Sequence, residues 1–378
     1  MDRVNLETHG FHPDSGFEHG RIKVIGVGGG GGNAVSHMVA QGLEGAEIYA
    51  MNTDMQALGK NLAPHKIQIG DYIAKGLGAG ANPDVGLKAA QESRHKIEEA
   101  VDNCDMLFIT AGMGGGTGTG AAGVVAEIAR KNGVVTIGVV TTPFAFEGKR
   151  RDLLARQGIS ALQENVNSLI VIPNDKLKTA LGSKTTLMEA FSAANDVLYN
   201  AIASMIGVIQ RPGHINVDFA DVKTVMTAPG LAVIGTGEAS GENRIEQAIE
   251  KAVSCELLED IELKNAKGLL VCVTSSEDIS LGEFTEIGDK LSHIAAGDAQ
   301  VIIGTAIDPE LKGKVDVTII ATGFDVDVTS NRSTHSVSGA RISQRPVPVT
   351  QTGSLIRKAK EEDGGLDKGS GKLDLSEF

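Results

Sequence analysis

Short runs of apolar residues alternate with helical patterns along the first half of the chain. The runs are IKVIGVG, EIYAMNTD, MLFITAG, VVTIGVV and SLIVIPN, between residues 21 and about 184, and most are separated by about 15 or more residues. This alternation is typical of βαβ units. Because the runs are continuously apolar, we expect strands covered on both faces, in a parallel sheet with helices on each side.

A long apolar stripe follows between Leu187 and Ile209. Its apolar residues recur mainly at steps of three and four, which predicts a helix. Thr186 and Glu189 have the spacing of a capping box, so we expect the helix to begin there. The stripe is wide, which indicates a helix packed between two bodies instead of on one surface.

A second alternation follows Pro212. It contains the predicted strands LAVIGTG, GLLVCVTS, AQVIIGTA and VDVTIIATG, with helices near Arg244 to Cys255 and Glu283 to Ile294. These elements predict a separate, smaller α/β domain. After Gly323 the periodicity stops and the chain is rich in Ser, Thr, Arg, Gln and Pro up to a terminal LDLSEF, so we expect a disordered tail.

Charge and composition narrow the function classes. The formal net charge of −13 and the absence of Trp argue against a nucleic-acid partner. From Phe324 onward eight Lys and Arg balance eight Asp and Glu, so the negative charge belongs to the folded body.

Cysteine usage and hydropathy indicate the compartment. The three cysteines show no CxxC spacing, which predicts free thiols in a reducing compartment and no Cys metal site. The N-terminus lacks the apolar core of a signal peptide, and no run approaches the roughly 20 apolar residues that span a bilayer. We expect a soluble cytoplasmic protein without membrane insertion.

Two glycine-rich segments follow predicted strands. GGGTGTG, from Gly114 to Gly120, lies between MLFITAG and an expected helix at Ala121 to Arg130, and GVGGGGGN, from Gly26 to Asn33, precedes an expected helix at Ala34 to Ala40. Free backbone N–H groups and helix dipoles at such places favour phosphate. The sequence therefore predicts an anion site at the carboxyl ends of the strands.

The ligand could be a dinucleotide or a nucleoside triphosphate. GVGGGGGN satisfies GxGxxG, and Asp54 lies where a ribose-binding acid is expected. An NAD(P)-binding oxidoreductase is therefore one alternative. Two phosphate-type loops on one sheet are better explained by a triphosphate. The chain has no GxxxxGK[ST], so this would not be a P-loop protein.

Ordered motifs from about Arg21 to Gly323 resemble the tubulin/FtsZ superfamily of GTPases, in particular its bacterial cell-division branch. GGGTGTG is the superfamily's tubulin signature. The other motifs are GVGGGGGN, NTD, GLGAGANP, PFAFEGKRR, IPNDKL, AANDVL and NVDFADV. The resemblance implies a parallel-sheet nucleotide-binding domain joined by a long central helix to a smaller α/β domain.

The resemblance also implies the nucleotide contacts. Those assigned to the phosphates are Gly29, Gly30, Gly31, Gly32, Gly116, Thr117 and Gly118, with Gly80 and Ala81 near the γ-phosphate. Those assigned to the nucleoside are Glu147 at the ribose, Arg151, Asn33 and Asp196 at guanine, and Phe191 stacking on the base. From the residues alone, Phe191 also fits the core stripe of the long helix, and EGKRR is typical of a solvated helix start.

NVDFADV, from Asn216 to Val222, carries the proposed chemistry. From the residues alone, Asp218 and Asp221 are a loop residue and a helix cap. The resemblance implies that both, with Asn216, face the nucleotide of the next protomer and polarise the attacking water while Mg²⁺ neutralises phosphate charge. Hydrolysis would then need assembly.

The resemblance implies the remaining assignments. The cofactors are GTP/GDP and Mg²⁺, held mainly through phosphates with no side-chain ligand assigned, and K⁺ is a further candidate. The protein would form a head-to-tail homopolymer at the bacterial mid-cell. Its tail would bind membrane-anchor and regulatory proteins, although LDLSEF lacks the family's Pro and basic ending.

The predicted segments run in order along the chain. They are a flexible 1–20, a GTP-binding domain 21–185, a central helix 186–211, a C-terminal domain 212–323, a linker 324–365 and a partner-binding peptide 366–378. A non-hydrolysing tubulin-like scaffold is the second alternative, and the presence of Asp218 and Asp221 argues against it.

Overall fold

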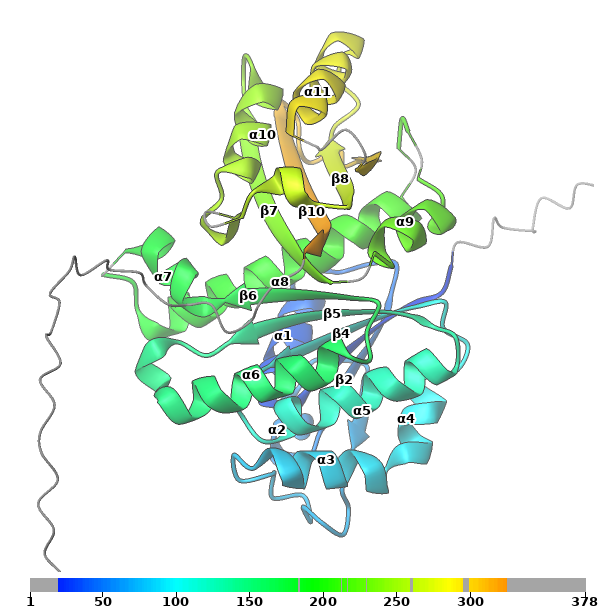
Figure 1. The fold of residues 1–378 in the computed structure, drawn as a ribbon, viewed down its shortest axis with the longest axis vertical. Coiled ribbons are helices and arrows are strands. Elements are labelled where there is room, and N and C mark those ends of the chain that lie inside the picture. The colour runs from blue at the N-terminus through cyan, green and yellow to red at the C-terminus, as the bar shows by residue number, and fades with distance from the viewer. Residues whose placement is uncertain are drawn as a thin grey trace, which may run out of the picture. The chain divides into compact units, whose positions relative to one another are not determined.

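The computed structural model describes residues 20–182, 184–211, 213–215, 217–228, 230–258, 261–294 and 299–324. The predicted N-terminal segment, linker and C-terminal peptide fall outside these residues, apart from Gly20 and Phe324. Strands of the described residues form one sheet in the order β3-β2-β1-β4-β5-β6-β7-β10-β8-β9. Figure 1 labels β2, β4, β5 and β6 of the first part and β7, β8 and β10 of the second. The strands are β1 Ile22–Val27, β2 Glu47–Asn52, β3 His65–Gln68, β4 Met106–Gly112, β5 Val135–Thr142, β6 Ser168–Pro173, β7 Leu231–Ser240, β8 Gly268–Ser275, β9 Gln300–Ile307 and β10 Lys314–Phe324.

The strands β3, β2, β1, β4, β5 and β6 are all parallel to their neighbours, as the continuous apolar runs predict. β1 is buried along its whole length. The hydrophobic pattern missed β3, whose sequence HKIQ has a single apolar residue and is exposed in its first half and only partly buried in its second. An edge strand has one neighbour and needs less apolar surface, so its signal is weak.

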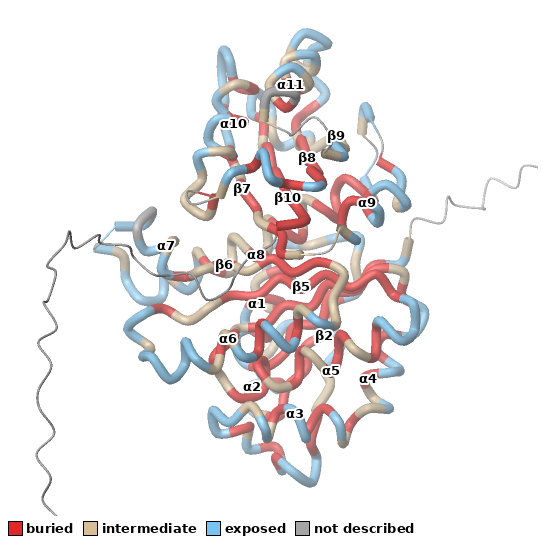
Figure 2. The backbone as a smooth tube through the Cα atoms, viewed as in Figure 1, coloured by how far each residue is buried: buried red, intermediate tan, exposed pale blue. Residues whose placement is uncertain are grey.

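Helices cover both faces of the parallel part. The α-helices of the described residues, including those of the C-terminal part, are α1 Gly28–Ala40, α2 Met55–Lys60, α3 Pro83–Glu92, α4 Arg94–Val101, α5 Thr117–Lys131, α6 Lys149–Gln163, α7 Asn174–Leu181, α8 Leu187–Gln210, α9 Phe219–Met226, α10 Arg244–Val253 and α11 Leu281–Ile294. α1 and α8 pack on the sheet face of Val24 and Phe108, while α3, α4, α5 and α6 pack on the face of Ile25 and Ile109. Figure 2 shows the buried strands between these layers.

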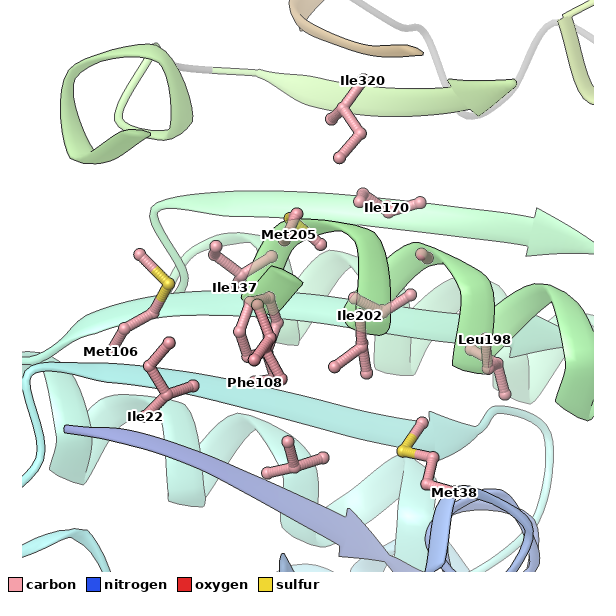
Figure 3. Close-up of a cluster of buried hydrophobic side chains, with 14 of the residues drawn as sticks. Ile22, Met38, Met106, Phe108, Ile137, Ile170, Leu198, Ile202, Met205 and Ile320 are labelled. Carbon is pink, nitrogen blue, oxygen red and sulfur yellow. The ribbon is translucent and has the colours of Figure 1, made fainter. Parts of the chain in front are cut away.

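The central helix α8 agrees with its prediction. The Thr186 hydroxyl accepts from Glu189 N at 3.3 Å and the Glu189 carboxylate accepts from Thr186 N at 2.7 Å, which is the predicted capping box. One hydrophobic cluster includes Ile202 of α8, Ile170 of β6 and Ile320 of β10 (Figure 3). α8 is therefore packed between the two α/β parts.

The C-terminal part continues the same sheet. β10 is antiparallel to both β7 and β8, and β8 and β9 are parallel. The link to the first part is short, since β6 and β7 pair only through Leu169 with Leu231 and Ile170 with Ala232. The expectation of a separate domain thus needs refinement, because a shared core and a shared sheet join the two parts.

An ion-pair network fixes α10 against α11 in this part. The Arg244 side chain is 8% exposed, and its guanidinium donates to Asp278 at 3.1 Å and to Glu283 at 2.7 Å. The hydrogen bond from Ser276, with those from Arg244, lowers the pKa of Asp278 to about 2, and Arg244 lowers the pKa of Glu283. Ionised carboxylates therefore stabilise the fold here.

Arg244→Met should lower the free energy of unfolding by about 1–3 kcal/mol, since it leaves two partly exposed carboxylates unpaired. Both carboxyl pKa values are lower in the folded state than in the unfolded state. The stabilisation is therefore complete above about pH 5 and is lost as pH falls toward about 2. Thermal unfolding of the unmodified protein and of Arg244→Met between pH 3 and 8 should show a difference in unfolding temperature that narrows below pH 5. A difference that does not change with pH would contradict this account.

Candidate functional site

A cavity of about 600 Å³ lies where the carboxyl ends of the parallel strands meet the first half of α8. This is the edge at which open α/β sheets bind ligands. Its lining contains these segments and residues: Gly29, Gly30 and Asn33; Asn52, Asp54 and Ala57; Leu77 to Ala81; Gly112, Met113 and Gly115 to Gly118; Thr141 to Pro143, Glu147 and Arg151; Asn174; and Phe191, Ala194, Asn195 and Leu198.

More of each glycine-rich segment is helical than the sequence predicted. α1 begins at Gly28 and α5 at Thr117, earlier than the expected Ala34 and Ala121. A Cβ on Gly30 would lie 2.8 Å from the Cα of Gly112, so the two segments touch without side chains between them. Both helix N-termini therefore line one cavity, where free N–H groups favour phosphate.

Gly31 and Gly32 are not among the residues that line this cavity. Gly31 is buried, and a Cβ there would lie 2.3 Å from the carbonyl oxygen of Thr110 in β4. Gly32 lines an adjoining cavity of about 50 Å³, and its carbonyl accepts from Asn61 Nδ2 at 2.8 Å. Packing alone requires a glycine at position 31, and the phosphate contacts of both residues stay predictions.

The loop that carries Gly80 and Ala81 lines the cavity from another side. Both residues have positive φ, at 57° and 56°, a conformation that is uncommon for alanine and carries strain there. Asn82 follows as the N-cap of α3, and its side chain accepts from Asp84 N at 3.0 Å. The loop therefore ends in a capped helix start beside the cavity.

Glu147 and Arg151 both line the cavity and pair with each other. The second Glu147 oxygen accepts from the backbone N of Phe144 at 3.0 Å. Phe191 is 41% exposed, and its ring meets that of Phe144 edge-on with centroids 5.4 Å apart. Phe191 thus lines the cavity instead of belonging to the core, and Glu147 is held in one orientation.

Asn33 lines the cavity, whereas Asp196 does not. Asp196 Oδ1 lies 2.7 Å from Nε2 of His37, which is one helical turn beyond Asn33 on α1. Its neighbour Asn195 does line the cavity. The guanine role of Asp196 stays a prediction.

Asparagine and threonine side chains at the strand ends were missed by the sequence analysis. Asn174 is 4% exposed and lines the cavity, and its Oδ1 accepts no hydrogen bond from the described residues. Asn52 and Thr141 line it as well. Their position directly after, or at the end of, an apolar run could have identified them, since polar groups at this edge face the ligand site.

The two carboxylates that line the cavity are already engaged. Asp54 Oδ1 caps α2 by accepting from Gln56 N at 2.8 Å and Ala57 N at 3.1 Å. Glu147 is held by Phe144 and Arg151. Neither is a free general base.

Asp218 and Asp221 lie elsewhere, at the start of α9. This helix follows the other end of α8 (Figure 1). Both are exposed, and among the described residues neither carboxylate has a hydrogen-bond or ion-pair partner. Asp218 occupies the N-cap position of α9 but makes no capping bond with its side chain. The predicted Asn216 falls outside the described residues.

The described residues lack two further kinds of feature, a cluster of metal-ligating side chains and a membrane-spanning helix. Among them no group of three or more His, Cys, Asp or Glu could hold a metal ion. In the same part of the chain, no helix is long and apolar enough to cross a bilayer. The three cysteines are unpaired, and burial raises the pKa of Cys104 to about 11.

Comparison with known proteins identifies the family. The family model "Tubulin/FtsZ family, GTPase domain" matches residues 21–182, and "FtsZ family, C-terminal domain" matches residues 230–325. The chain is 49% identical over 339 residues to the cell division protein FtsZ of Coxiella burnetii, which covers 90% of this chain and 86% of that protein. It belongs to the tubulin/FtsZ family.

Further matches support the FtsZ branch. The chain is 53% identical over 304 residues to cell division protein FtsZ of Pseudomonas aeruginosa, covering 80% of this chain and 77% of that protein. An FtsZ dimer structure from M. jannaschii matches with a TM-score of 0.77 and 43% identity, covering 80% of this chain and 88% of that one. These matches support a tubulin-like GTPase of the cell-division branch, and neither alternative is supported.

Gly30→Ala should destabilise this FtsZ-type site, whereas Gly29→Ala should not. The new Cβ of Gly30→Ala meets Gly112 at 2.8 Å, and relieving that overlap should cost about 1–3 kcal/mol of unfolding free energy. Gly29→Ala meets nothing within 4 Å and lies in the same helix turn, so it is the matched control. Urea unfolding of both variants measures the difference; equal stabilities would disprove the close-contact explanation.

Proposed function

We propose that the protein is a GTPase of bacterial cell division that polymerises head to tail, and that GTP bound by one copy is hydrolysed with carboxylates of the next. The observation that carries this proposal is the separation of binding and chemistry in one chain. The cavity's own carboxylates are engaged, while Asp218 and Asp221, which have no partner in the part of the chain that the structure describes, lie beyond the opposite end of α8.

The length of α8 makes the separation large. Its 24 residues span about 36 Å, and the residues that line the cavity lie in its first half. A single copy therefore cannot bring Asp218 to its own nucleotide without unfolding. A second copy stacked end to end would bring its own carboxylates to the cavity, as a head-to-tail polymer requires.

The proposed contacts follow the cavity. Phosphates would bind the backbone N–H groups at Gly29, Gly30 and Gly116 to Gly118, with Gly80 and Ala81 near the γ-phosphate. The nucleoside would contact Glu147, Arg151, Phe191 and Asn33, with Asp196 at the guanine edge. Asn174 adds a buried acceptor without a partner in the described structure.

The donor set of the cavity fits Mg²⁺ held mainly by phosphate oxygens and water. Its two carboxylates are engaged by backbone N–H groups, so a cage of protein ligands is absent from the described lining. When bound, the ion neutralises charge on the transferred phosphoryl group. K⁺ is proposed as a further cation without an assigned residue.

Asp218 and Asp221 would orient the attacking water. Exposed carboxylate oxygens without a partner among the described residues can accept hydrogen bonds from water. Positioning of water and nucleotide supplies most of the rate in such reactions. We further propose action in the cytoplasm at the mid-cell division site and docking of partners through residues 366–378.

Asp221→Ala should leave GTP binding nearly unchanged and strongly reduce turnover, with longer-lived polymers, because the residue lies outside the protomer's own cavity. Turnover should fall by about 10²-fold or more. Glu250→Ala on α10 removes the same charge from an exposed site and is the control. Loss of GTP affinity in Asp221→Ala would mean that the residue belongs to the protomer's own pocket.

GTP turnover per molecule should rise from a threshold as protein concentration increases, because the site is complete only between copies. Light scattering on the same samples should rise at the same threshold. Turnover per molecule that stays constant on dilution would refute the shared site.

A further inference from the structure

The loop that precedes Asp218 is attached to β9. β9 is the last strand of the sheet and pairs only with β8 among the described strands. On its free side, the backbone N of Thr305 donates to the carbonyl of Ile215 at 3.1 Å. The loop therefore accepts a hydrogen bond from a backbone N–H that would otherwise be unpaired at the edge of the sheet.

The Thr305 side chain makes a second attachment. Its hydroxyl accepts from the backbone N of Ile215 at 2.8 Å and lies 3.3 Å from the Ile215 carbonyl, to which it can donate. Thr305 is 1% exposed. One buried residue thus engages both backbone groups of Ile215, three positions before Asp218, and a buried hydroxyl has no water to replace these partners.

Close packing fixes the loop on both sides of Ile215. A Cβ on Gly213 would lie 1.8 Å from the Thr305 carbonyl oxygen, so backbone lies directly on backbone. A Cβ on Gly304 would lie 2.6 Å from the Val217 side chain, which is buried. The loop therefore follows the surface of Gly304 and Thr305.

The residue after Asp218 is held as well. The Phe219 ring lies against Gly20, where a Cβ would come within 2.9 Å, and the Gly20 carbonyl accepts from Gln210 Nε2 at 2.9 Å. Asp218 is thus an exposed carboxylate, without a partner among the described residues, between two anchored neighbours. Anchored neighbours on both sides of an exposed carboxylate are the arrangement expected of a group that acts on a ligand of another chain.

We propose that Thr305 is a positioning residue of the shared GTPase site: its hydroxyl holds the loop so that Asp218 and Asp221 reach the neighbouring copy's nucleotide in the reactive geometry. The inference rests on the proposed function. Thr305 itself touches no nucleotide in this account and acts through Ile215. Small displacements of groups that orient a reactant cost large factors in rate.

The test substitution is Thr305→Val, which keeps the shape and removes the hydroxyl. Turnover per polymerised protomer should fall about tenfold or more, while GTP affinity of the dilute protein stays within about twofold. Thr305→Ser, which restores the hydroxyl, should recover most of the turnover.

Thr318→Val is the matched control. Thr318 is 1% exposed on β10, and its hydroxyl lies 2.9 Å from that of Ser204 in α8, so the variant removes a buried hydroxyl from the same sheet away from the loop. Thermal unfolding of both variants checks that they fold with similar stability. Turnover of Thr318→Val should stay close to that of the unmodified protein.

Combination with Asp221→Ala gives an independent readout. If Thr305 acts through the carboxylates, Thr305→Val should add little to the loss already caused by Asp221→Ala, because residues that act as a unit are not additive. Equal turnover of Thr305→Val and Thr318→Val, or full additivity with Asp221→Ala, would overturn the proposal. The concentration dependence of the unmodified protein tests the shared site separately.

Discussion

The contact between two helix starts is the constraint on which the rest of the site depends. α1 and α5 follow the neighbouring strands β1 and β4, and Gly30 and Gly112 touch without a side chain between them. Any larger residue would push the two segments apart. Because they touch, two sets of unpaired backbone N–H groups face one cavity at the carboxyl edge of the sheet, where they favour the phosphates of one nucleotide.

The central helix α8 separates the cavity from the loop of Asp218. Its first half contributes Phe191, Ala194, Asn195 and Leu198 to the cavity, and its other end leads to the loop of Asp218. Its middle is buried between the two α/β parts, so it cannot bend to bring the ends together. A rigid helix between a binding half-site and a chemical half-site makes a second copy necessary for catalysis in the proposed function.

Buried polar contacts hold the exposed acids in place. Thr305 on β9 fixes the loop before Asp218, and Gly20 supports the ring of Phe219 after it. The Arg244 network similarly holds α10 and α11 through Asp278 and Glu283. The carboxylates of the loop differ from these structural acids because no described residue neutralises them, which leaves them available to a neighbour.

The sequence by itself determined the parallel sheet, the capped central helix, the glycine-rich segments at the strand ends and the family. These features depend on local periodicity, on Thr186 with Glu189 and on contiguous motifs, which a chain expresses without its distant neighbours. Only the tertiary structure decided that Gly31 packs on β4, that Asn174 is a buried cavity residue and that Asp196 bonds to His37. It also decided that β9 holds the loop before Asp218 through Thr305, a residue about 90 positions away in sequence. Such contacts join residues far apart in the chain, so no local pattern encodes them.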